Sequence, residues 1–187
     1  LTAGLLGSCG RPAGKLELTS YKDPYFPETY EVTLNECAYR VDASGDTHIV
    51  GRCVTQNAPS DGPITQMLHM HVFWQPRPGV TFANATTATA VLRYVVATPG
   101  GTAVYGGTGF VYPRRQRGGR LEASIESGRL RLEMQSGQVP ELLGDARLRG
   151  EIKARHDPHA TLSLVRELDY HAAGRRGDSP AVDGRGP

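Results

Sequence analysis

Apolar and polar side chains alternate with a period of two along most of this chain, in short runs separated by glycine, proline and aspartate. In residues 146–155, for example, Leu148, Ile152 and Ala154 alternate with charged side chains. Successive side chains of a strand point to opposite faces, so this pattern predicts a strand with one apolar and one charged face. Comparable runs occupy residues 15–20, 30–41, 48–55, 67–74, 87–97, 102–112, 121–126, 129–135 and 160–170.

These runs predict an all-β fold, specifically an antiparallel β-sandwich of about nine or ten strands with irregular N- and C-terminal extensions. The run at 160–170 could instead form a helix, because leucine, arginine and glutamate favour helices. Glycine (23 residues) and proline (13 residues) are frequent in the 187-residue chain, which favours short elements joined by turns. The formal net charge is only +2, so no overall field would recruit nucleic acid.

The domain organisation follows the same pattern. Residues 1–12 form a small, apolar arm, residues 13–171 contain the strand-like runs, and residues 172–187 form a tail rich in glycine, arginine and proline. The tail lacks apolar periodicity and cannot bury a core by itself. We therefore expect one β domain whose two extensions dock on a partner.

The apolar arm contains Leu6, Gly7, Ser8 and Cys9 in succession. This segment resembles the lipobox of bacterial lipoproteins, in which a branched apolar residue and two small residues precede a lipidated cysteine. The resemblance implies an export signal, a lipid on Cys9 and a chain held at the periplasmic side of a bacterial membrane. Alternatively, residues 1–10 are an apolar arm that packs against a partner or membrane lipid.

The other two cysteines flank a turn rich in Asp, Ser and Gly between the runs at 30–41 and 48–55. A hairpin centred on Gly45 would place Cys37 opposite Cys53, at the separation that a disulfide requires. We therefore predict a disulfide between Cys37 and Cys53. Persistent disulfides are typical of exported proteins, so the bond would agree with a periplasmic location.

Two further groups of side chains suggest binding chemistry. His69 and His71 lie two apart on a predicted strand, so both imidazoles would share one face and could bind a metal, with Met67 and Met70 as soft copper ligands. They could equally form an ordinary polar face. The basic residues expected to contact a protein partner or lipid headgroups are Arg114, Arg115, Arg117 and Arg120 in one turn and Arg175 and Arg176 in the tail.

The sequence contains no recognisable catalytic motif: no G-x-S-x-G, no H-E-x-x-H, no P-loop and no dinucleotide fingerprint. We therefore expect a non-catalytic accessory subunit without a cofactor, located in a large bacterial membrane complex such as a photosynthetic reaction centre with its antenna. Its partners would be protein subunits and membrane lipid, and not nucleic acid. The alternatives are a periplasmic copper-binding module that uses His69 and His71, and a carbohydrate- or adhesion-type binding module.

Overall fold

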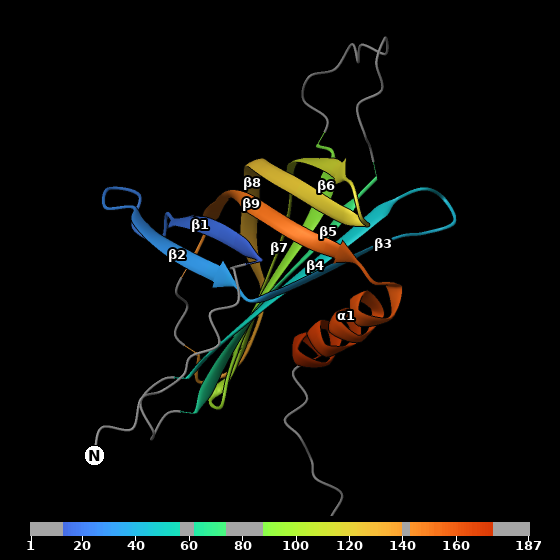
Figure 1. Cartoon of the computed structure of the whole chain (residues 1–187). Helices are drawn as coiled ribbons and strands as arrows, with labels where there is room; N and C mark the ends of the chain where they lie inside the picture. The colour runs from blue at the N-terminus through green and yellow to red at the C-terminus, as the bar shows by residue number, and fades with distance from the viewer. Residues whose placement is uncertain (1–12, 57–61, 74–87, 140–142, 174–187) are drawn as a thin grey trace, which may run out of the picture.

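The computed structural model describes residues 13–56, 62–73, 88–139 and 143–173, and this part of the chain holds nine strands and one helix (Figure 1). The all-β prediction and the expected number of strands are confirmed. The elements are β1 (Gly14–Ser20), β2 (Glu28–Leu34), β3 (Glu36–Val41), β4 (Thr47–Gln56), β5 (Pro63–Val72), β6 (Ala90–Thr98), β7 (Gly101–Gln116), β8 (Arg120–Gly137), β9 (Ala146–His156) and α1 (Pro158–Ala172).

The nine strands form one sheet in the order β2-β1-β9-β3-β4-β5-β6-β7-β8, and β8 also pairs with β9. Strands β3 to β9 therefore close into a ring, from which the β1–β2 hairpin extends along β9 (Figure 1). The sheet is mixed because β3 and β9 run parallel where they pair, and it does not show the two separate antiparallel layers that we expected. Register shifts in β7 and β8 mark bulges, which bend long strands and help a sheet to close.

The alternating pattern produces two apolar clusters, one on each face of the ring. The inner cluster joins the inner face of the ring to the β1–β2 hairpin and includes Leu68, Leu92 and Leu121. The outer cluster lies beneath α1, where Leu164 and Leu168 pack on side chains such as Val50 of the sheet. Helix α1 is therefore held against the outside of the ring by apolar burial.

The chain segment at 160–170 is helical, so the strand predicted there is wrong. Asp157 caps the helix: its carboxylate accepts a hydrogen bond from the Ala160 amide at 2.9 Å, and Pro158 follows at the first helical position. The buried positions Thr161, Leu164, Leu168 and Ala172 recur every three or four residues. That spacing places them on one helical face, whereas a strand would divide them between two. No helix in the described residues is long and apolar enough to cross a membrane.

The β3–β4 hairpin has a different register from the one predicted. Its turn closes where the Asp42 amide donates to the Asp46 carbonyl, so Cys37 lies opposite Gly51. Cys53 is opposite Gln66 of β5 on its other side. Both cysteines are buried free thiols, so the predicted disulfide is wrong. Burial is the main reason that the pKa of Cys37 rises to about 12.

Candidate metal centre

Three histidines gather on the outer face of the ring, beside α1. His48 lies on β4 directly opposite His71 of β5, and His69 lies two residues earlier on β5. Alternation in β5 places both of its histidines on the outer face and sends Leu68 and Met70 into the inner cluster. The expected common face for His69 and His71 is confirmed, and β4 adds His48 to it.

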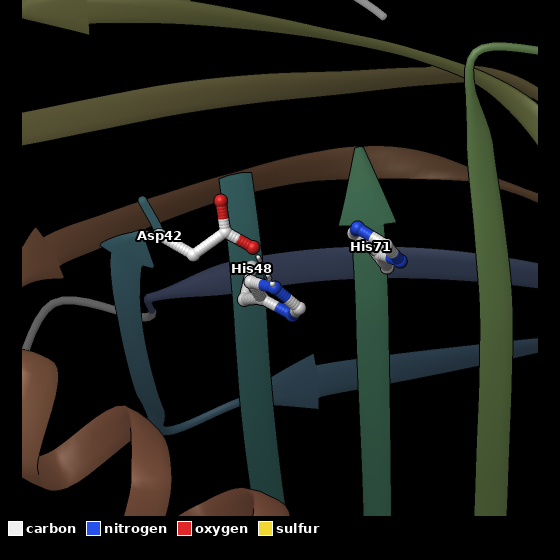
Figure 2. A group of neighbouring side chains, drawn as sticks. All are labelled: Asp42, His48 and His71. Carbon is white, nitrogen blue, oxygen red and sulfur yellow. Dashed lines mark hydrogen bonds and ion pairs between the residues drawn. The ribbon is translucent and has the colours of Figure 1, made fainter. Parts of the chain in front are cut away.

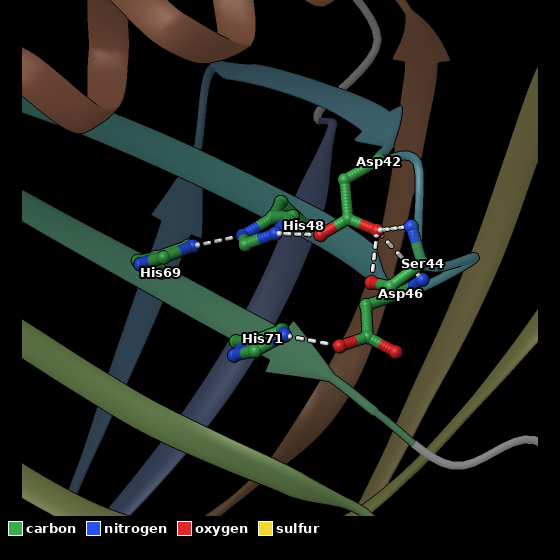
Figure 3. A network of polar contacts seen from close by, with 6 residues as sticks. All are labelled: Asp42, Ser44, Asp46, His48, His69 and His71. Atoms are coloured by element: carbon green, nitrogen blue, oxygen red, sulfur yellow. Dashed lines mark hydrogen bonds and ion pairs between the residues drawn. The ribbon is translucent and has the colours of Figure 1, made fainter.

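The β3–β4 turn brings two carboxylates to these imidazoles. Asp42 Oδ1 accepts hydrogen bonds from the Ser44 amide at 3.0 Å, the Ser44 hydroxyl at 2.6 Å and the Asp46 amide at 3.0 Å. These bonds hold the Asp42 side chain so that Oδ2 lies 3.1 Å from Nε2 of His48. Asp46 Oδ2 lies 2.9 Å from Nε2 of His71 (Figure 3). The turn sequence thus determines where the Asp42 carboxylate points.

The imidazoles contact one another closely. The rings of His48 and His71 are stacked, with centroids 4.5 Å apart and planes 6° apart, and the centroids of His48 and His69 are 5.5 Å apart. Nδ1 of His48 lies 3.2 Å from Nε2 of His69, so a hydrogen bond joins these two rings. Asp42, His48 and His69 therefore form a continuous chain of hydrogen bonds (Figure 3).

The electrostatics of the cluster keep two of the imidazoles, those of His48 and His69, neutral near pH 7. Burial, followed by the nearby His48, His71, Arg93 and Arg40, lowers the pKa of His69 to about 4. Burial also lowers the pKa of His48, although Asp42 opposes the shift. The pKa of Asp42 is well below its ordinary value, chiefly because the Ser44 hydroxyl donates to its carboxylate. At pH 7 the cluster therefore combines the neutral imidazoles of His48 and His69 with the ionised carboxylate of Asp42.

Asp42, His48 and His71 form a group suited to a metal ion, because their potential ligand atoms all lie within 4.8 Å of one another (Figure 2). Tetrahedral ligands at about 2.1 Å from zinc are about 3.4 Å apart, which is close to the 3.1 Å between Asp42 and His48. The side chains are 26%, 14% and 36% exposed, respectively, so an ion can reach them from solvent. Two histidines and one carboxylate are a common donor set for divalent transition metals.

The structure changes the ligand set that the sequence suggested. His69 belongs to the cluster through its bond to His48 and is not in the ligand group, which contains Asp42 and His48 together with His71. Met70 is buried inside the ring and Met67 is buried beneath α1, so neither is a soft copper ligand for this site. The sequence signal for the missed residues is the spacing of Asp42, Asp46 and His48 around the turn.

The other predicted contact residues lie apart from this cluster. Arg114, Arg115, Arg117 and Arg120 are exposed around the β7–β8 turn, and none forms an ion pair with another described residue. Cys9, Arg175 and Arg176 lie outside the described residues.

Comparison of the chain with protein-family models, curated proteins and solved structures finds no significant match. The functional argument therefore depends on the geometry of the chain itself. The chain forms a ring-shaped, mixed β-sheet whose outer face carries the ligand group of two histidines and one aspartate.

Proposed function

We propose that this protein is a non-catalytic binding protein for a divalent copper or zinc ion, which Asp42, His48 and His71 hold. The observation that carries the proposal is the convergence of these three side chains from two strands and a turn, with ligand atoms within 4.8 Å of one another. Imidazole and carboxylate ligands suit Cu²⁺ and Zn²⁺, and Cu²⁺ would bind more tightly under the Irving–Williams order.

His69 would act as a positioning residue for this metal. A histidine that binds a metal through Nε2 commonly donates its Nδ1 hydrogen to a neighbouring acceptor, which fixes the tautomer and the ring. Nε2 of His69 lies 3.2 Å from Nδ1 of His48 and is suited to that role. Its lowered pKa keeps His69 neutral and able to accept this hydrogen bond at pH 7.

Calorimetric titration of the metal-depleted full chain with Zn²⁺, and competition titration with Cu²⁺, test the proposal at pH 7. We expect one ion per chain and an affinity loss of about 100-fold or more in His48→Gln and His71→Gln, because each variant removes a ligand. Asp42→Asn should also weaken binding, since the amide can keep the turn but lacks the charge. His69→Gln should lower the metal affinity by about 10- to 100-fold.

The matched control is His159→Gln, which alters an exposed histidine on α1 outside the cluster. It should bind the ion as tightly as the unaltered chain. Equal losses in His159→Gln and His48→Gln would contradict the proposal, as would a double variant of His48 and His71 that still binds one ion.

We further propose that the protein works in the periplasm as an accessory subunit of a bacterial membrane complex. The export part of this proposal depends on the lipobox-like segment ending at Cys9. Two aromatic side chains between β1 and β2, Tyr25 and Phe26, are 85% and 74% exposed, which suits a protein contact. Recovery of the chain without partners from detergent-solubilised membranes would argue against the accessory-subunit proposal. Replacement of Tyr25 and Phe26 by serine should release any partner that binds there.

A further inference from the structure

An open pocket of about 570 Å³ lies between the inner face of the ring and the β1–β2 hairpin, at the end away from the β3–β4 turn. Its walls include Leu18 of β1, Val32 of β2, Ile64 and Gln66 of β5, and Tyr94 and Val96 of β6. The pocket opens to solvent, because exposed residues such as Tyr30 and Pro99 stand at its edge. Its volume lies within the range of small-molecule pockets, about 300–1,000 Å³.

The walls are mainly apolar and include one hydrogen-bonded polar pair, formed by a buried tyrosine and a partly buried glutamine. The hydroxyl of Tyr94 donates a hydrogen bond to Oε1 of Gln66. Tyr94 is only 1% exposed, and its burial raises the pKa of its hydroxyl, so the group stays neutral. The Tyr94 oxygen retains lone pairs and the Gln66 amide retains hydrogens, so the pair can both accept and donate a further bond.

The charges near the pocket restrict what it can hold. Among the described residues that line the pocket, Glu31 is the one ordinarily ionised side chain, and it is exposed on β2. An ionised ligand would therefore lose its hydration inside the pocket without gaining a counter-ion there. A neutral, mainly apolar molecule would displace water from the apolar walls of the pocket. It could use the Tyr94–Gln66 pair to set its orientation.

We propose that the pocket binds a neutral, mainly apolar small molecule that carries a single hydrogen-bonding group, which meets Tyr94 and Gln66. This second site is independent of the proposed metal centre. Gln66 points inward near the start of β5, whereas His69 and His71 lie on the outer face towards the end of the same strand. Loss of metal binding would therefore leave this site intact.

The test uses N-phenyl-1-naphthylamine, a neutral apolar probe with one N–H group, whose fluorescence rises in apolar surroundings. The full chain should bind it saturably with one site per chain. It should bind the anionic analogue 8-anilino-1-naphthalenesulfonate at least about tenfold more weakly. Val96→Phe, which adds volume to the pocket wall, should reduce affinity for the neutral probe by at least about tenfold.

The matched control is Val91→Phe, on the same strand but on the outer face, where Val91 is 47% exposed. This variant should bind the neutral probe as the unaltered chain does. If Val96→Phe fails to fold, Ile64→Phe provides the same test from a partly buried wall position. No saturable binding, stronger binding of the anion, or equal affinity in the pocket variant and Val91→Phe would overturn the proposal.

Discussion

The stability of the fold should decrease between pH 7 and pH 5 because of His69. This histidine is neutral in the folded chain, with a pKa of about 4, and has an ordinary pKa of 6.5 when unfolded. Its surroundings disfavour a proton: it is largely buried, and His48, His71, Arg93 and Arg40 all add positive charge or potential positive charge nearby. Between pH 4 and pH 6.5 the unfolded chain therefore binds more protons than the folded chain.

The linkage relation converts this difference into free energy. The contribution of His69 is fully present above its unfolded pKa and is lost as the pH falls towards its folded pKa. For the two values above, the free energy of unfolding at pH 5 is lower than at pH 7 by about 2 kcal/mol. The pKa of His48 is also lowered, so His48 adds to this loss of unfolding free energy as the pH falls. Asp42 contributes a loss only at more acidic pH, because its pKa is lowered from 3.8.

Urea denaturation in the presence of a chelator, at pH 7, 6 and 5, measures the effect without bound metal. From pH 7 to pH 5, the free energy of unfolding should fall by about 2 kcal/mol more in the unaltered chain than in His69→Gln, because glutamine does not titrate. His159→Gln, an exposed-site control, should behave as the unaltered chain does. Equal losses in the unaltered chain and in His69→Gln would refute the assignment of a buried, neutral imidazole at this position.

Three other substitutions or reactions test the fold. Leu168→Ala should lower the free energy of unfolding by about 3 kcal/mol in urea, because this fully buried side chain joins α1 to the sheet; a loss below about 1 kcal/mol would mean that the helix does not pack there. Asp157→Ala should lower the free energy of unfolding by about 1 kcal/mol, and Asp157→Asn should lower it clearly less, since asparagine also caps helices. Cys37 and Cys53 should react with a thiol reagent only after unfolding, as mapped by mass spectrometry; recovery of a disulfide-linked peptide would contradict the free thiols.

Much of the secondary structure follows from local pattern. Alternation along β9, with Leu148, Ile152 and Ala154 facing inward, gave the right element because one-sided burial of a strand imposes a period of two. The same rule placed His69 and His71 on one face. It failed at α1, where an Asp157 cap and helical spacing outweigh a short apparent alternation.

The amino-acid sequence by itself determined the strand class, the faces of the strands and the turn chemistry around Asp42. The tertiary structure decided which strands meet and in what register. A shift of two residues in the β3–β4 hairpin separates Cys37 from the position opposite Cys53, and the β4–β5 register places His48 beside His71. Neither pairing is encoded within one strand, since hydrophobic alternation is unchanged by a two-residue slip. The β4–β5 register therefore created the candidate metal centre, and the approach of the β1–β2 hairpin to β5 and β6 created the pocket.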